Sequence, residues 1–248
     1  MIVNKSQVLL IIILFLLIGI NSYSQPNKRT NLWYFSDSIA LDFNSGAPVE
    51  GTPCHIDGQG WGATATMCDT NGNLLFYSEG DSVYNKNHHS SVYSMGPGIY
   101  HQGAQSTISL PVPGSDSLFY IFTARMNRFP DPMRYYIVDM SLNGGLGEVI
   151  DIDTLAAGYD AADQIQAVYL NNKVDYWIIT RKYLENKFAA FLVTAEGVNP
   201  QPVLSPAPNK DYLGNDKMGF LKVSYDKKYM VACFRPDVEL YKFNNETG

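Results

Sequence analysis

The feature that most constrains the fold of this chain is a pair of short apolar runs that recurs along its length. Both members of each pair are rich in Tyr, Phe, Val and Ile, which favour extended backbone in a sheet. The first members begin near residues 74, 118, 175 and 228, so the unit recurs at intervals of roughly 45 to 55 residues. The four pairs are LLFYS with SVYN, SLFYIFTAR with RYYIVDM, VDYWIITRKY with FAAFLVT, and KYMVACF with VELYKF.

This interval is typical of β-propellers, whose four-stranded blades repeat at about 40–50 residues. A helical solenoid would show a 3.6-residue periodicity instead, and the one candidate helix, residues 156–169, has no clean apolar stripe. One small sheet cannot cover both of its faces, whereas sheets stacked side by side bury them against each other. The sequence therefore predicts an all-β chain, a β-propeller of four-stranded antiparallel blades of which about four are present.

The residues between the runs support this prediction. Residues 70–73 (TNGN) tolerate the positive φ angles of a tight hairpin, and residues 143–145 (NGG) offer the same freedom after the second pair. Residues 200–208 (PQPVLSPAP) are rich in proline, which cannot donate to a ladder, so we expect a surface connection there and no central strand.

Residues 1–24 have the layout of a secretory signal peptide. Lys5 gives a positive amino-terminal region, residues 8–20 are continuously apolar, and Ser22 and Ser24 are small residues placed ahead of a cleavage site. A transmembrane anchor is the alternative, but a bilayer-spanning helix needs about 20 apolar residues. We expect cleavage near Ser24–Gln25, a secreted or cell-surface location, and no membrane span in the mature chain.

The mature chain, residues 25–248, is expected to be a propeller domain. Hydrophobic residues make up 46% of the sequence, which is enough for a substantial core. The formal net charge is −6, and cleavage would remove Lys5 but no acid. Because an acidic chain has no positive field to attract phosphates, we expect no nucleic-acid partner.

Cysteine usage leaves one question open. The three cysteines are Cys54, Cys68 and Cys233. An oxidising compartment permits a disulfide between Cys54 and Cys68, the pair closest in sequence. Cys68 also fits as a small core residue at the end of ATATMC, and this second interpretation is favoured. No CxxC motif or Cys/His cluster predicts a metal site, and we expect no cofactor.

A series of segments from Asn31 onward resembles a known domain. These are NLWYFSDSIALDFNSGAPV, DTNGNLLFYSEGDSVYNKNH, SLFYIFT, RYYIVDMSLNGGLGEV, DYWIIT and VSYDKKYMVA. The series is similar to the WD40/YVTN-like propeller domain of secreted, gliding-motility-associated surface proteins. The resemblance implies export, a type IX secretion sorting domain further along, and more blades than four. It therefore carries the expectation that the sequence ending at Gly248 is a fragment.

The loop after LLFYS is the candidate ligand site. It gathers Glu79, Asp81, Asn85 and His88, with Asn87 and His89 beside them, at a position where propellers usually bind ligands. The alternative is a solvated loop in which Asn and Asp bond their own backbone. Asp69, Asn71 and Asn73 begin like a calcium loop, but Gly72 is fourth and Gly80 is twelfth, so a hairpin turn is expected instead.

Catalytic motifs are missing from the sequence. It contains no G-x-S-x-G, H-E-x-x-H or G-x-G-x-x-G pattern, and residues 223–232 match a sialidase Asp-box only at Ser224 and Asp226. Acid pairs such as Asp151 with Asp153, or Asp160 with Asp163, are interpreted as surface charge.

Two hypotheses for the function remain open. The first is a non-catalytic binding or scaffold module for a protein or glycan ligand at the cell surface. Trp61, Tyr84 and Tyr100 are candidate aromatic contacts for such a ligand, but packing in the core is the favoured interpretation for them. The second is an extracellular propeller enzyme such as a glycoside hydrolase, which would need two carboxylates roughly 5–10 Å apart. We favour the first, with no catalytic residues.

Overall fold

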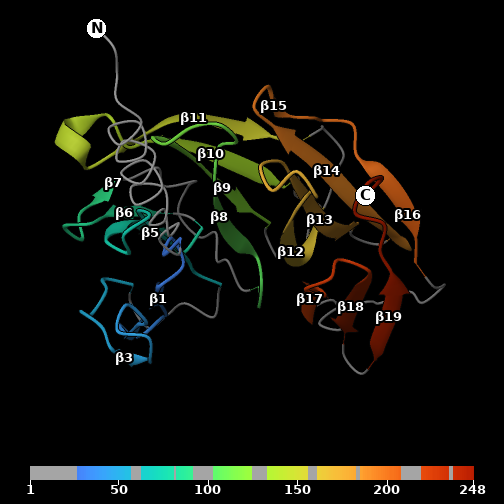
Figure 1. The fold of residues 1–248 in the computed structure, drawn as a ribbon, viewed down its shortest axis with the longest axis horizontal. Coiled ribbons are helices and arrows are strands. Elements are labelled where there is room, and N and C mark those ends of the chain that lie inside the picture. The colour runs from blue at the N-terminus through green and yellow to red at the C-terminus, as the bar shows by residue number, and fades with distance from the viewer. Residues whose placement is uncertain are drawn as a thin grey trace, which may run out of the picture.

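The computed structural model describes residues 27–56, 63–80, 82–91, 103–124, 133–155, 161–182, 185–207, 219–234 and 237–248. Over these ranges the chain is all-β, and its strands form five antiparallel sheets in chain order. The sheets follow an arc from residues 32–50 at lower left, across the top, to residues 219–242 at lower right (Figure 1). The signal-peptide prediction lies outside the described residues.

The first two sheets are built from short strands. The first has the order β1-β2-β3, and the second has the order β4-β5-β6-β7. Their bounds are Leu32–Tyr34 (β1), Ala40–Asp42 (β2), Val49–Glu50 (β3), Ala65–Cys68 (β4), Leu74–Ser78 (β5), Val83–Asn85 (β6) and Ser90–Ser91 (β7).

The third and fourth sheets hold the longest strands. The third has the order β11-β10-β9-β8; in the fourth, β12 to β15 follow one another and β16 pairs with β14. Their bounds are Thr107–Pro111 (β8), Leu118–Thr123 (β9), Arg134–Asp139 (β10), Glu148–Thr154 (β11), Ala161–Tyr169 (β12), Tyr176–Lys182 (β13), Lys187–Thr194 (β14), Gly197–Val198 (β15) and Val203–Pro206 (β16).

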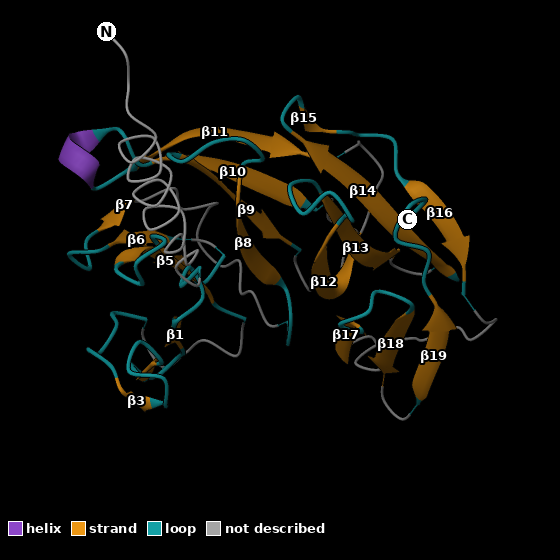
Figure 2. Cartoon of the chain, viewed as in Figure 1, coloured by secondary structure: helices purple, strands orange, loops and turns teal. Residues whose placement is uncertain are grey.

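The fifth sheet has three strands, β17 (Gly219–Val223), β18 (Tyr229–Phe234) and β19 (Val238–Lys242). In the described part of the chain the one helical element is a 3-10 turn, η1 (Asn143–Gly145), drawn in purple in Figure 2. None of the described residues forms a helix with the length and hydrophobicity needed to cross a bilayer.

All four predicted strand pairs form antiparallel ladders: β5 with β6, β9 with β10, β13 with β14, and β18 with β19. Residues 32–50 form a further sheet that the spacing did not predict, because its strands are only two or three residues long. The sheets contain three, four, four, five and three strands, so the predicted number of four strands holds for two of them.

The predicted turns are present, and one predicted connection differs. Gly72 (φ 91°) closes the hairpin between β4 and β5, and Asn143, Gly144 and Gly145 all have positive φ after β10. The proline-rich segment contains β16, which pairs with β14 as an extra strand and is therefore more than a surface connection. This edge position suits proline, because on the outer side of an edge strand there is no neighbouring strand to which a backbone N–H would donate.

Each hydrophobic cluster lies between two consecutive sheets. Strand residues alternate between faces, so neighbouring positions serve different clusters. In β9, Phe119 and Ile121 face the second sheet, whereas Tyr120 and Phe122 face the fourth. Burying one such side chain contributes about 1.5–3 kcal/mol. Other members of these clusters are Tyr34 and Tyr77 between the first and second sheets, and Ile179, Met230 and Leu221 between the fourth and fifth.

The first strands of the second to fifth sheets, β4, β8, β12 and β17, lie side by side on the inner side of the arc. A parallel bridge joins Gln105 to Gln164, and the Ser109 hydroxyl donates to the Thr66 carbonyl at 3.2 Å. These contacts place the starts of the inner strands together, so polar residues from three sheets meet there.

Candidate functional site

The predicted ligand loop folds mainly on its own polar groups. The Asn85 Oδ1 atom accepts hydrogen bonds from the backbone N–H groups of Asn87 at 2.9 Å and His89 at 3.2 Å. This is the backbone-bonding role that the alternative interpretation assigned to the loop. Asp81 lies outside the described residues.

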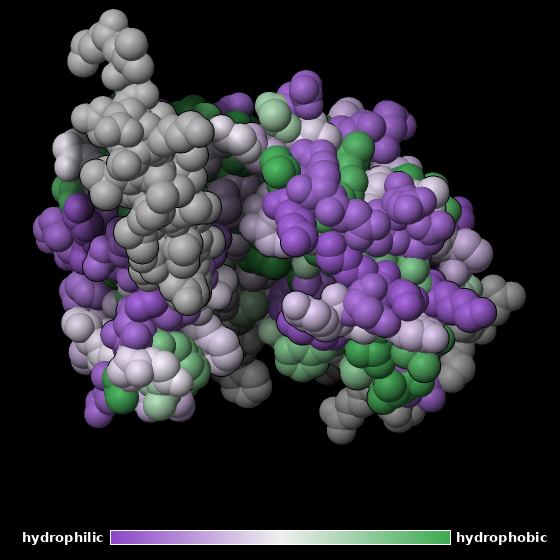
Figure 3. Space-filling model, viewed as in Figure 1, coloured by the Kyte–Doolittle hydropathy of each residue, from purple (hydrophilic) through white to green (hydrophobic). Residues whose placement is uncertain are grey.

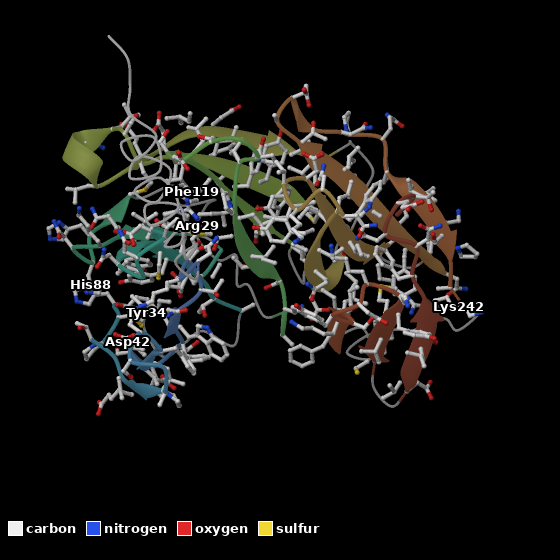
Figure 4. The ribbon with its side chains drawn as sticks, in the orientation of Figure 1. Arg29, Tyr34, Asp42, His88, Phe119 and Lys242 are labelled. Carbon is white, nitrogen blue, oxygen red and sulfur yellow. The ribbon has the colours of Figure 1, made fainter. Side chains whose placement is uncertain are left out.

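His88 belongs to a tyrosine–histidine cluster between the first and second sheets, which we define as Tyr34, His55, Tyr77, Tyr84 and His88. The Tyr77 hydroxyl lies 3.0 Å from His88 Nδ1 and accepts the His55 backbone N–H at 3.1 Å. The His55 and His88 rings stack with centroids 5.1 Å apart. Figure 4 labels Tyr34 and His88 at the left end of the molecule; their ring centroids are 6.2 Å apart.

Glu79 lies at the other side of this cluster. Its Oε1 atom accepts the Tyr84 hydroxyl at 3.3 Å, and the Tyr84 ring stacks on Tyr77 with centroids 4.9 Å apart. The structure thus brings Glu79 and His88 onto one aromatic group, while Asn85 shapes the loop between them. These contacts assign the predicted residues to the packing of two sheets.

Burial favours the uncharged forms of Tyr34, Tyr84 and His88 in this cluster. Burial, with Tyr77 as a secondary cause, raises the pKa of Tyr34 to about 12. Burial raises the pKa of Tyr84 to about 12 as well. Burial and the neighbouring His55 lower the pKa of His88. Among the described residues, no group of three or more His, Cys, Asp or Glu side chains is placed to hold a metal ion.

A second place, which the sequence did not predict, is a polar hollow on the inner side of the arc. It has a volume of about 420 Å³ and is open to solvent. It lies where β1 ends and where β4 and β8 begin. Its lining residues are Phe35, Ser36, Ala63, Thr64, Ala104, Gln105 and Thr107.

The hollow can offer hydrogen bonds but no charge, because none of these described lining residues is acidic or basic. The Thr107 side-chain oxygen is buried and has no hydrogen-bond partner among the described residues. Phe35 is 39% exposed, so one aromatic ring is accessible at the edge. The Gln105 amide is bonded to the backbone of Leu221, so the hollow offers a ligand hydroxyl groups and one aromatic ring, which suit a neutral polar molecule.

Asp163 belongs to β12 and lies next to the hollow, against the segment that precedes β8. It is 1% exposed, and its Oδ2 atom accepts the backbone N–H of Ala104 at 3.4 Å. Within the part of the chain that the structure describes, its Oδ1 atom has no hydrogen-bond partner. Because burial disfavours the charged carboxylate, the pKa of Asp163 is raised to about 7. Asp163 is therefore not the surface charge that the sequence suggested; exposed Asp151 does fit that interpretation.

Two glycines allow close contacts at this centre: Gly103 between the segment before β8 and β12, and Gly219 between β17 and β18 of the fifth sheet. A Cβ atom on Gly103 would lie 2.6 Å from the Asp163 Cβ, and one on Gly219 would lie 1.7 Å from the Cys233 carbonyl oxygen. Neither position tolerates a side chain without movement of the backbone. None of the inner strands was among the predicted strand pairs, so no sequence signal pointed to this centre.

Trp61 and Tyr100, two of the predicted aromatic contacts, lie outside the described residues, and Tyr84 packs in the cluster described above. No protein-family model matches the chain, and no curated protein sequence matches it.

Solved structures give two similar folds. A protein from Lactobacillus plantarum aligns with a TM-score of 0.45 and 16% identity, covering 85% of this chain and 62% of that one. The dihydro-heme d1 dehydrogenase NirN aligns with a TM-score of 0.43 and 14% identity, covering 91% of this chain and 45% of that one. The chain thus spans less than two thirds of either neighbour.

Proposed function

We propose that this chain is an exported, non-catalytic β-propeller module that binds a neutral polar ligand, such as a glycan, at the polar hollow. Five meander sheets arranged in an arc, with each hydrophobic cluster shared by consecutive sheets, support the assignment of the sheets as blades. The signal-peptide pattern of residues 1–24 supports export.

The composition of the hollow carries the proposal. Sugar rings present apolar faces and several hydroxyl groups, which matches an exposed Phe35 ring beside the Ser36 and Thr64 hydroxyls. A charged ligand would have no partner of opposite sign among the described residues of the lining.

A glycan array followed by titration calorimetry tests this function. The mature chain is expected to bind at least one neutral glycan, and Phe35→Ala is expected to weaken that binding about tenfold. Tyr225→Ala is the matched control, because Tyr225 is fully exposed on a turn of the fifth sheet. Failure to bind any glycan, or equal losses in the two variants, would refute the proposal.

An extracellular glycoside hydrolase is the second candidate, favoured by Asp163. A carboxyl with a pKa raised to about 7 suits a general acid near neutral pH. Hydrolysis assays on the glycans from the array separate the two functions. Turnover that Asp163→Asn abolishes would establish the enzyme, and binding without turnover agrees with the module.

N-terminal sequencing of the exported protein tests export, with Gln25 as the expected first residue.

A further inference from the structure

Among the described residues, the first and fifth sheets each pack one face on a neighbouring sheet, and no other described sheet lies against the opposite face. In the fifth sheet, Leu221, Met230 and Ala232 face the fourth sheet. The alternate residues point the other way, and we call them the C-terminal face. Its members are Phe220, Lys222, Tyr229, Val238, Leu240 and Lys242, with Val231 and Cys233 between them in the register.

The C-terminal face is apolar and exposed. Val238 is 70% exposed, Leu240 71%, Phe220 54% and Tyr229 45%. Figure 3 shows hydrophobic side chains gathered at lower right, over β18 and β19. Large apolar side chains that are adjacent on one sheet face mark an interaction surface.

The first sheet presents a second such surface, the N-terminal face. The register places Trp33 opposite Leu41 and Leu41 opposite Glu50 on this face. Trp33 is 49% exposed, and its ring lies 4.8 Å from that of Phe43. The opposite face of the sheet, with Tyr34 and Ala40, is buried against the second sheet.

The charges on the two faces are opposite. Lys222 pairs in register with Val231, which pairs with Leu240, and Lys242 pairs with Tyr229, so the C-terminal face carries two lysines among its apolar residues. Figure 4 shows Lys242 at the right end of the molecule. Glu50 gives the N-terminal face a negative charge. Pairing either face with itself would bring like charges together, whereas pairing one with the other brings Lys and Glu together.

We propose that the C-terminal face of one copy of this chain packs on the N-terminal face of a second copy. Every cluster within the chain joins a sheet to the next sheet along the sequence, and this contact repeats that relationship between molecules. It is head-to-tail, so each copy keeps one face available for a further copy.

Sedimentation of the mature chain tests the association. The mass is expected to rise above that of one chain as the concentration increases. Leu240→Glu is expected to weaken association about tenfold or more. Leu142→Glu is the matched control, since Leu142 is also exposed but lies outside both faces. Lys222→Glu with Lys242→Glu is expected to weaken association similarly, and adding Glu50→Lys is expected to restore it. A single-chain mass at every concentration, or no rescue, would overturn the proposal.

Disulfide trapping identifies which faces meet. Glu50→Cys places a thiol on the N-terminal face, and Cys233 already lies on the C-terminal face. Oxidation is expected to give a series of disulfide-linked oligomers. Their formation requires both thiols and is lost with Cys233→Ser. A cross-link within one chain would show that the arc closes on itself. Dimers of the wild-type chain through Cys233 would show that the C-terminal face pairs with itself. Either result contradicts the head-to-tail contact.

Discussion

The Gln105 side chain forms two hydrogen bonds with the backbone of Leu221, 116 residues away in the chain. The Leu221 N–H donates to Oε1 at 2.8 Å, and Nε2 donates to the Leu221 carbonyl at 3.1 Å. The Gln105 side chain thereby bonds the backbone N–H and C=O groups at the free edge of β17, as a neighbouring strand would. This contact ties together three sheets near the polar hollow.

Gln105→Ala is therefore expected to destabilise the protein by about 2–4 kcal/mol, because it leaves two buried backbone groups of Leu221 without partners. Urea unfolding followed by circular dichroism measures the change. Gln201→Ala, on an exposed turn, is the matched control and is expected to change the stability by less than about 0.5 kcal/mol. Similar losses in both variants would contradict the bridging role.

The fourth and fifth sheets are joined by a buried ion pair. Arg181 and Glu239 lie 3.3 Å apart with side chains 6% and 10% exposed, and the Arg181 guanidinium lies 4.5 Å from the centre of the Phe234 ring. Glu239→Gln is expected to cost about 3–5 kcal/mol, since it leaves a buried positive charge without its counter-ion.

The control for this pair is Glu185→Gln. Glu185 pairs with Lys187 at 3.2 Å on the surface, where such a pair contributes about 0–1 kcal/mol. Chemical denaturation of both variants compares the two environments. If Glu239→Gln proves as mild as Glu185→Gln, the pair contributes little to the contact between these sheets.

Cys54 and Cys68 are free, buried thiols, which answers the question that the sequence left open. Burial raises the pKa of Cys68 to about 11, so almost none of it is thiolate at neutral pH. In dilute native protein, Ellman's reagent is therefore expected to modify Cys233 alone, and in denatured protein all three thiols. Detection of a single thiol after denaturation would reveal a disulfide instead.

Much of the fold follows from local patterns in the sequence, and the polar centre does not. Strand pairs such as β9 with β10 were predictable because their residues are apolar on both faces and flanked by turn residues. The first sheet was missed because strands as short as Val49–Glu50 leave no periodicity. Asp163 was assigned to the surface because no local pattern shows that the segment around Ala104, 59 residues away, packs on it.

The predicted ligand residues show the same limit. Glu79, Asn85 and His88 are close in the sequence, so their grouping was visible there. Tyr77 and His55, which surround His88 between the first two sheets, come from other elements. Polar residues that are adjacent in sequence were therefore assigned to a ligand although their described contacts are within the protein.

Asp163 is expected to make stability depend on pH. Its folded-state pKa of about 7 lies above the ordinary value of 3.8, so between these values the folded state holds a proton that the unfolded state has lost. The contribution of Asp163 to the free energy of unfolding is fully present below about pH 4 and is lost as the pH rises to about 7. Asp163→Asn is expected to remove this dependence and to stabilise the protein above about pH 7. Asp151→Asn, at an exposed site, is expected to retain it. A profile unchanged by Asp163→Asn would show that the carboxyl is not buried.

His88 gives the opposite dependence, which is measured most simply in the Asp163→Asn background. Its pKa is lowered below the ordinary 6.5 by burial and by His55 and His89, so the unfolded state takes up a proton first as the pH falls. The contribution of His88 is present above about pH 6.5 and is lost as the pH falls through its lowered folded-state pKa. Acidification is expected to weaken the contact between the first two sheets, because a protonated His88 Nδ1 no longer accepts from Tyr77 and faces His55. His88→Asn is expected to flatten the acid limb of the urea-unfolding profile, since asparagine tolerates the positive φ of 61° at this position. His89→Asn, on the exposed side of the loop, removes only the smallest of the causes that lower the pKa of His88, so it is expected to leave most of that limb in place. If both variants flatten it equally, the dependence does not arise from the contact of His88 with Tyr77.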